Sequence, residues 1–235
     1  MLLLLILLAS PLPSRAFIAV IPGGIEARPH SWPYMAETKM RTDKNTQKSC
    51  GGFLVREDFV LTVAHCFERK MVVILGAHNF TRNEPTMQTI LVIQAVPHPE
   101  YDPDSVFSDI MVLKNLRNLL SSSLSVLLVQ ESRDWVKPGQ VCSAAGWGKT
   151  ENDKFPNILQ EVELEMQDKK MSYDDTTQIC VGNSLYLKNA EMGDSGALLV
   201  CNNVVQGIVS NRFKNCSPGV FTRIPSFVPW IHRIM

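Results

Sequence analysis

Short runs rich in valine, isoleucine and leucine recur along the chain, and residues that favour turns separate them. Runs of this kind at such spacing are typical of the strands of an all-β barrel or sandwich. The predicted strands cover residues 59–63, 72–75, 89–96, 110–113, 141–145 and 204–209. The pattern therefore predicts an all-β protein.

Only the C-terminal end has helical spacing. The apolar residues that recur there at intervals of three and four are Phe227, Trp230, Ile231 and Ile234. Residues 118–138, with several serines and a Pro-Gly pair, form the expected connection between two halves. We therefore predict two β-rich halves, near residues 21–120 and 121–225, followed by a short C-terminal helix.

The beginning of the sequence is apolar in a different way. It is almost entirely aliphatic, and small residues, prolines and one arginine follow. The run is too short to span a bilayer, and Ser14 and Ala16 match the small side chains that signal peptidase selects. We predict a cleaved signal peptide over residues 1–16, with cleavage after Ala19 as the alternative, a propeptide over residues 17–20 and no membrane anchor.

Composition narrows the class of protein. The chain has 235 residues, of which 45% are hydrophobic, so it can bury a sizeable core. Lysine plus arginine equals aspartate plus glutamate at 23 each, so no overall field favours nucleic acid, an anionic membrane or tight binding to anionic proteoglycans. Export would let the six cysteines form bridges. Sequons for glycosylation at Asn79 and Asn215 agree with a secreted protein.

Three separated segments carry the residue types of nucleophilic catalysis. They contain His65 in Thr-Val-Ala-His-Cys, Asp109 in Ser-Asp-Ile and Ser195 in Gly-Asp-Ser-Gly. A serine hydroxyl is a weak nucleophile, so it needs a histidine to take its proton and a carboxylate to orient that histidine. The order His, Asp, Ser is one of three known for such a triad. The five histidines lack zinc-ligand spacing, so we expect neither a metal nor a cofactor.

Several longer motifs match one protein family in the same order. They are Cys50-Gly-Gly-Phe-Leu-Val, Leu75-Gly-Ala-His-Asn, Ala145-Gly-Trp-Gly and the segments that hold the three residues above. From about Ile21 to its C-terminus the chain resembles trypsin-like serine proteases, and more narrowly the granzyme, chymase and mast-cell-protease branch. The resemblance implies two six-stranded antiparallel β-barrels with the active site between them.

The resemblance also implies an activity and partners. It points to a secreted serine endopeptidase, stored in granules, which cleaves protein or peptide substrates and is open to serine protease inhibitors. His65 and Asp109 would come from the first barrel and Ser195 from the second. A second hypothesis is a protease-shaped binding protein with weak or no activity. Since all three triad residues are present, the sequence favours the enzyme.

The family gives further residues a role. Gly193 and Ser195 would donate the backbone N–H groups of the oxyanion hole. Ile21 would become the N-terminus when the propeptide is removed, and its ammonium would pair with Asp194 to form that hole. Ser210 matches the family serine that hydrogen-bonds the triad aspartate.

The cysteines are sorted in part by the same resemblance. It implies the bridges Cys50–Cys66 and Cys142–Cys201. Cys180 and Cys216 remain, and three alternatives stay open for them: pairing with each other, free thiols, or a bridge between molecules.

Departures from the family pattern cluster around the substrate site. Pro22 follows Ile21 where a branched aliphatic is usual, and its missing N–H and fixed φ weaken docking of the new N-terminus. Ala197 and Leu198 add bulk behind the nucleophile. Arg212 replaces a glycine whose backbone pairs with substrate, and it either attracts an acidic substrate residue or occludes the primary pocket.

The primary pocket differs from that of trypsin. Its floor corresponds to Asn189, with Ala190 beside it and Gly219 on the facing wall. Asn189 lacks the carboxylate that selects lysine or arginine, so we expect non-tryptic specificity.

Overall fold

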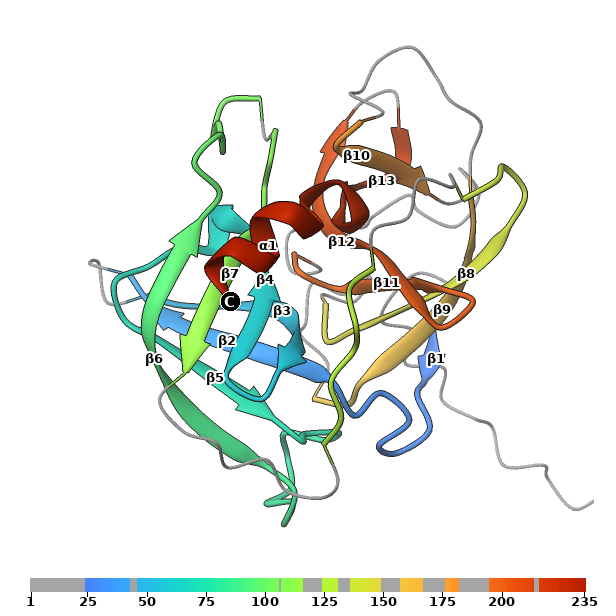
Figure 1. Cartoon of the computed structure of the whole chain (residues 1–235). Coiled ribbons are helices and arrows are strands. Elements are labelled where there is room, and N and C mark those ends of the chain that lie inside the picture. The colour runs from blue at the N-terminus through green and yellow to red at the C-terminus, as the bar shows by residue number, and fades with distance from the viewer. Residues whose placement is uncertain are drawn as a thin grey trace, which may run out of the picture.

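The computed structural model describes nine stretches of the chain, and for a few strand residues it describes the backbone alone. The stretches are residues 24–42, 46–105, 107–115, 124–130, 136–148, 157–166, 176–181, 195–213 and 216–235. The backbone alone is described for residues 115, 180, 211–213 and 216–219. Two β-sheets, one from each half of the sequence, make up most of this part (Figure 1).

Six antiparallel strands close the first barrel. In order around the barrel they are β2 (Met35–Arg41), β3 (Gln47–Arg56), β4 (Phe59–Thr62), β7 (Met111–Asn115), β6 (Gln88–Pro97) and β5 (Met71–Leu75). Phe53, Leu61 and Val73 have no exposed surface and belong to its core. The strands that the apolar runs predicted in this half are confirmed to within one or two residues at each end.

The second sheet is also antiparallel. Its six longer strands, in spatial order, are β9 (Gln160–Glu165), β8 (Val141–Gly146), β11 (Leu198–Cys201), β12 (Val204–Phe213), β13 (Cys216–Arg223) and β10 (Gln178–Val181). A bridge between Met166, just past β9, and Val181 of β10 brings the two outer strands together. The all-β prediction is confirmed, with one closed six-stranded barrel and a second sheet whose outer strands meet at this bridge.

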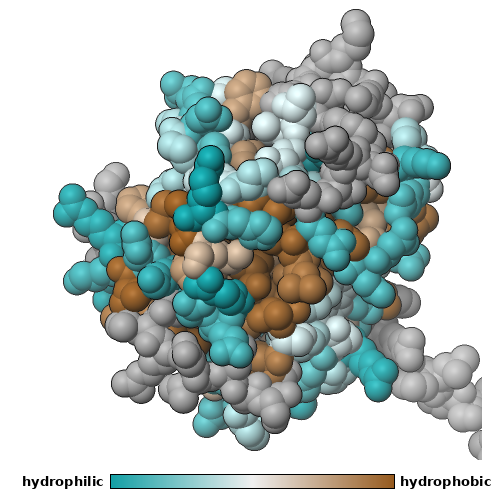
Figure 2. All heavy atoms as spheres, viewed as in Figure 1, coloured by the Kyte–Doolittle hydropathy of each residue, from teal (hydrophilic) through white to brown (hydrophobic). Residues whose placement is uncertain are grey.

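The two ends of the chain interlock the halves. The short strand β1 (Ile25–Glu26) pairs with β9, so it lies on the second sheet although the sequence places it in the first half. The helix α1 (Val228–Ile234) follows the 3₁₀ turn η2 (Ile224–Phe227) and joins a core cluster that includes residues of both halves, and its Trp230 contacts His98, just after β6 of the first barrel. Figure 2 shows hydrophobic side chains gathered across the middle of the face where α1 lies in Figure 1. Neither half is therefore complete without a segment from the other.

The predicted C-terminal helix is confirmed in its position and in its apolar face. Trp230 and Ile231 are 6% and 0% exposed, and the Trp230 ring lies 4.8 Å from the ring of His98 in an edge-on contact. Within the described residues, no helix is long and apolar enough to cross a membrane.

Both disulfides that the resemblance implied are present. Cys50 bridges to Cys66 with a Cα–Cα distance of 6.5 Å, and Cys142 bridges to Cys201 with 4.5 Å. They close loops of 16 and 59 residues, which in the chain-entropy description stabilise the fold by about 3 and about 4 kcal/mol.

The strand register answers one question about the two remaining cysteines. Cys180 of β10 lies opposite Val220 of β13, whereas Cys216 is four residues further along β13 and lies opposite Phe213. Four residues of extended strand span roughly 13 Å. A disulfide needs Cα atoms within about 7 Å, so this register excludes a bridge between Cys180 and Cys216 in the same molecule.

Candidate active site

Ser195 lies in a tight turn that both halves of the molecule hold. The amide of Gly51, on β3, donates to the Ser195 carbonyl oxygen at 2.8 Å, and the amide of Gly196 donates to the carbonyl oxygen of Val209, on β12, at 2.8 Å. Gly196 has a φ of +85°, and a Cβ there would lie 1.9 Å from the Gly51 oxygen. Only glycine fits this conformation and this spacing. The two hydrogen bonds then hold the turn between β3 and β12.

His65 reaches the serine from the other half. It sits in the 3₁₀ turn η1 (Ala64–Cys66) that follows β4, and the next residue, Cys66, is tied to β3 by its disulfide. The Nε2 atom of His65 lies 2.8 Å from Ser195 Oγ. The imidazole side chain remains 30% exposed, so it is open to solvent in part.

Asp109 is fully buried behind the histidine. Its Oδ1 accepts a hydrogen bond from the His65 backbone N–H at 2.9 Å, and its Oδ2 lies 2.7 Å from His65 Nδ1. Ser210 Oγ also donates to Oδ2, and Thr222 Oγ1 donates to the Asp109 backbone oxygen at 2.8 Å. A buried carboxylate is costly without partners, and His65 and Ser210 supply them.

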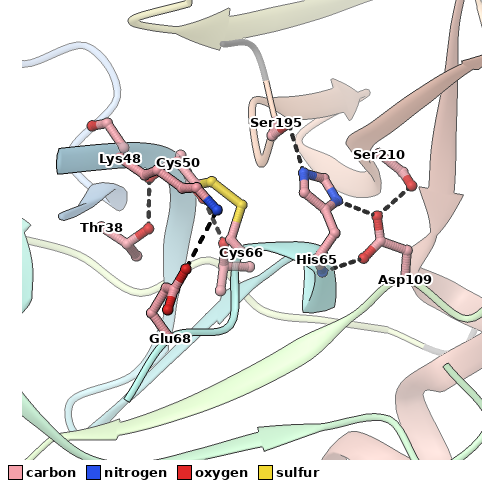
Figure 3. Close-up of a disulfide and its surroundings, with 12 residues drawn as sticks. Thr38, Lys48, Cys50, His65, Cys66, Glu68, Asp109, Ser195 and Ser210 are labelled. Carbon is pink, nitrogen blue, oxygen red and sulfur yellow. Dashed lines mark hydrogen bonds and ion pairs between the residues drawn. A yellow bond between two sulfur atoms is a disulfide. The ribbon is translucent and has the colours of Figure 1, made fainter. Parts of the chain in front are cut away.

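The proton positions follow from this chain of contacts (Figure 3). An ionised carboxylate only accepts hydrogen bonds, so the Nδ1 atom of His65 carries the proton that faces Asp109. In the neutral imidazole Nε2 is then the acceptor, and it faces the Ser195 hydroxyl. The site is therefore arranged to withdraw a proton from the serine.

The structure brings together the four predicted residues that it describes fully: His65, Asp109, Ser195 and Ser210. The predicted signal peptide and propeptide, residues 1–20, lie outside the described residues, and so do seven residues discussed for the site, activation or glycosylation: Ile21, Pro22, Asn189, Ala190, Gly193, Asp194 and Asn215. Arg212 and Gly219 are described by backbone alone. Gly219, on β13, lies opposite Val181, and Arg212 stands on β12 where the pairing with β13 is irregular.

The two bulky residues after the nucleophile are accommodated in the core. Ala197 and Leu198 are 4% and 0% exposed. Leu198 begins β11, opposite Ala145, and the Ala197 methyl faces the bare side of Gly146, where an added Cβ would lie only 3.0 Å away. Their bulk lies behind the nucleophile as predicted, and it leaves the Ser195 hydroxyl free to bond His65.

The sequence analysis did not identify two residues that contribute to the site, Gly51 and Thr222. Gly51 had a signal, because it belongs to the Cys-Gly-Gly motif, and a Cβ there would lie 2.9 Å from the Gly196 backbone. Thr222 had none, since it lies 113 residues from Asp109 and only the fold brings the two together.

The segment before Asp109 packs closely against it. The Tyr101 amide donates to the His98 carbonyl oxygen at 3.0 Å. Burial, with the negative charge of Asp109 next in importance, raises the pKa of Tyr101, and burial lowers the pKa of His98 below its usual value. Both side chains are therefore neutral at pH 7. Of the two histidines near Asp109, it is His65 that hydrogen-bonds the nucleophile.

The described residues also include one group of possible metal ligands and one predicted glycosylation site. Cys50, His65 and Cys66 form the one group of possible metal ligands in the described part of the chain, but both sulfurs are joined in a disulfide. Asn79 is 7% exposed, and its Oδ1 accepts hydrogen bonds from Thr81 N and Oγ1. Glycosylation of Asn79 stays a prediction.

A nucleophilic serine, a histidine and a buried carboxylate in one hydrogen-bonded line define the class of a serine hydrolase. Comparison with known proteins gives the family. The family model described as Trypsin matches residues 21–231. The chain therefore belongs to the trypsin family, and it is a serine endopeptidase.

Similar proteins include a mast cell protease and a granzyme. Mast cell protease 8 of Mus musculus is 46% identical over 100% of this chain and 98% of its own length, and granzyme B of Homo sapiens is 45% identical over 99% and 98%. A solved structure described as "Structure of GrC" has a TM-score of 0.85 and 44% identity, and the match covers 91% of this chain and 98% of that one. These matches and the intact hydrogen-bonded triad support the protease over the binding-protein alternative.

Proposed function

We propose that Ser195, His65 and Asp109 hydrolyse peptide bonds through an acyl-enzyme. The observation that carries the proposal is the 2.8 Å hydrogen bond between His65 Nε2 and Ser195 Oγ, with Asp109 oriented behind it. The roles follow those worked out for the triad of this same family.

In the first half of the reaction His65 takes the Ser195 proton as Oγ bonds to the substrate carbonyl carbon. The resulting imidazolium gives that proton to the leaving amine when the C–N bond breaks. In the second half a water molecule loses a proton to His65 and attacks the acyl ester, and the proton returns to Ser195 as the acid product leaves. Asp109 stays ionised and stabilises the imidazolium.

Two further parts of the proposal concern residues outside the described ones. Gly193 and Ser195 would hold the oxyanion with their backbone N–H groups. That hole would form when Ile21, freed by removal of residues 17–20, pairs with Asp194. The family match begins at residue 21, which supports Ile21 as the first residue of the active chain.

A fluorophosphonate probe, which forms a covalent bond with an activated serine, tests the mechanism. We expect labelling of the chain that begins at Ile21, and none of the Ser195→Ala variant or of the chain that still carries residues 17–20. Absence of labelling in the correctly folded chain beginning at Ile21 would favour a binding protein. Equal labelling of both chain forms would remove the Ile21 step while leaving the triad intact.

Primary specificity is proposed to be non-tryptic because Asn189 supplies no carboxylate for a lysine or arginine side chain. Charged hydrogen bonds to a buried carboxylate contribute roughly 1.5–3 kcal/mol, so their loss removes a tenfold or larger preference for cationic residues. In a peptide-library cleavage profile we expect Lys and Arg to be depleted at the residue before the cut. Enrichment of either would contradict the pocket assignment.

Secretion with storage in granules is proposed from the relatives named mast cell protease and granzyme. Protein or peptide substrates follow from membership of a protease family. Serine protease inhibitors are proposed as further partners, because they react with the same activated serine.

A further inference from the structure

The strand β6 carries two large aliphatic side chains on the outside of the first barrel. Leu91 and Ile93 are 58% and 45% exposed. They alternate along the strand with Ile90 and Val92, which pack against the core, so both exposed side chains lie on the outer face. Single exposed aliphatic residues are common on protein surfaces, but two on one face of a strand form a continuous apolar ridge.

The strand register places positive charges beside this ridge. Val72 of β5 lies opposite Leu91, and Lys39 of β2 lies opposite Val72, so the three residues share the outer face. Arg41 is two residues after Lys39 on β2, and its amide donates to the carbonyl oxygen of Lys70 at 3.5 Å, two residues before Val72. We define the outer patch as Lys39, Arg41, Lys70, Val72, Leu91 and Ile93.

The charges of the outer patch are not neutralised by neighbouring acids. Within the described residues, none of its three cations forms an ion pair. Glu37 is the one acidic residue of β2, β5 and β6, and it is only 7% exposed. Lys39 Nζ lies 4.7 Å from the centroid of the Phe80 ring, which favours the charged ammonium there. Since the whole chain is neutral, this positive charge is a local feature.

Aliphatic side chains next to unpaired cations distinguish between three possible occupants. A sulfated polysaccharide would use the cations and leave Leu91 and Ile93 in water. A second copy, related by a two-fold axis, would bring the same cations against each other. A bilayer with anionic lipids satisfies both parts, because its headgroups attract cations and aliphatic side chains enter the boundary between headgroups and acyl chains.

We propose that the outer patch binds the surface of bilayers that contain anionic phospholipids. The patch lies on strands of a closed barrel, so it is formed before the lipid arrives. Around the barrel β6 is three strands from β3 in either direction, and Figure 1 shows it on the side of the barrel away from the second sheet. Because β3 carries the contact of Gly51 with Ser195, the catalytic serine stays open to solvent on the bound protein.

Sedimentation with vesicles tests the proposal by comparing phosphatidylcholine alone with a mixture that contains phosphatidylserine. The chain that begins at Ile21 is used, since the aliphatic residues at the start of the sequence would themselves bind lipid. Each cation near an anionic surface contributes about fivefold to partitioning, so three favour the mixed vesicles by about a hundredfold at low salt. High salt should reduce this preference, because it screens exposed charges.

Replacing the three cations together, in Lys39→Gln/Arg41→Gln/Lys70→Gln, should remove the preference for phosphatidylserine. The matched control replaces three exposed cations elsewhere on the molecule: Arg28, Lys137 and Arg233. This control has the same net charge as the first variant and should keep most of the preference. Equal losses in the two variants would show that only net charge matters, and would overturn the proposal.

Replacing the ridge, in Leu91→Asn/Ile93→Asn, leaves every charge in place and should weaken binding to the mixed vesicles by about tenfold to thirtyfold. The expected size follows from burying two side chains that are about half exposed. Leu128→Asn/Val141→Asn removes side chains that are 65% and 55% exposed outside the patch, and it should bind as the wild type does. Unchanged binding in Leu91→Asn/Ile93→Asn overturns the proposal.

Further measurements on the same proteins identify the competing occupants. Fluorophosphonate labelling of each variant shows that it is folded with an active serine, and cleavage of a soluble peptide should be unaffected by mixed vesicles. Inhibition by the vesicles would place the bilayer over the catalytic serine and overturn the proposal. Retention on dextran sulfate without binding to vesicles would assign the patch to a polyanion. A dimer in light scattering that is lost in Leu91→Asn/Ile93→Asn would assign it to a second copy, and either result overturns the proposal.

Discussion

The Asp109→Asn variant is expected to lose about 10⁴ in kcat while it keeps its fold, the size that this change has in the triad of the family itself. Oδ1 of Asp109 accepts the His65 backbone N–H, so the amide oxygen of the asparagine must take that place. Its NH₂ group then faces His65 Nδ1, which has to become an acceptor. The ring proton moves to Nε2, and Ser195 Oγ no longer faces a base.

The kcat for a peptide substrate at pH 7, with unfolding by urea as a check on folding, measures this effect. Ser210→Ala is a graded comparison, because it removes one donor to the carboxylate and leaves the tautomer unchanged. A hydrogen bond to a charged group contributes about 1.5–3 kcal/mol, so a loss of about tenfold to hundredfold is expected there. Asp58→Asn removes a surface carboxylate bonded to Arg56 and should leave kcat unchanged. A loss below tenfold in Asp109→Asn would contradict the orienting role.

The parts of the site that the sequence predicted are those with short local motifs. His65, Asp109 and Ser195 each stand in a recognisable segment, and the resemblance supplied their roles and both disulfides. Short runs of valine, isoleucine and leucine between turn residues predicted the strands, and the spacing around Trp230 predicted α1. These features depend on short segments of sequence, so they can be predicted before the fold is known.

Features that depend on which strands meet could not be predicted in the same way. The turn at Gly196 requires glycine because β3 brings the Gly51 oxygen against it, and Thr222 supports Asp109 from β13 of the second sheet. The exchange of β1 and α1 between the halves likewise has no local signal, since either element could have covered its own half.

Burial of Glu37 is another outcome that the sequence conceals. A glutamate in a strand that also carries Lys39 is typical of a solvated face, yet Glu37 is only 7% exposed. It lies opposite Gly51 in the β2–β3 register, and directly opposite residues in a sheet share a face. A Cβ on Gly51 would meet the Gly196 backbone, so Glu37 is on the face of β2 and β3 that the nucleophile turn covers.

Because Glu37 is buried, its carboxyl loses its proton at a higher pH than usual. Burial raises the pKa of its carboxyl to about 8, although the nearby positive charge of Lys39 acts in the opposite direction. Ser49 Oγ donates a hydrogen bond to Glu37 Oε1. At neutral pH the carboxyl is therefore mostly protonated in the folded protein, whereas in the unfolded chain it is ionised.

The Glu37→Gln variant is therefore expected to be more stable than the wild type at pH 9 and equally stable near pH 4. Between the unfolded pKa of about 4.5 and the folded pKa of about 8, the folded state binds a proton that the unfolded state has released, so stability falls as pH rises. The full stability is present below pH 4.5 and the loss is complete above pH 8. A difference of about 3.5 pKa units corresponds to at most about 5 kcal/mol. Glutamine keeps the acceptor for Ser49 and cannot ionise.

Thermal unfolding from pH 4 to pH 9, in the Ser195→Ala background to prevent self-cleavage, measures the difference. For a chain of this size 1 kcal/mol shifts Tm by about 2–4 °C, so Glu37→Gln should unfold about 10 °C higher at pH 9. Glu57→Gln, on the exposed turn after β3, is the matched control and should follow the wild-type curve. Parallel curves for Glu37→Gln and wild type would show that Glu37 is ionised in the fold. In that event water or an additional cation must reach it between β2 and the turn at Ser195, because an isolated charge cannot be buried there without cost.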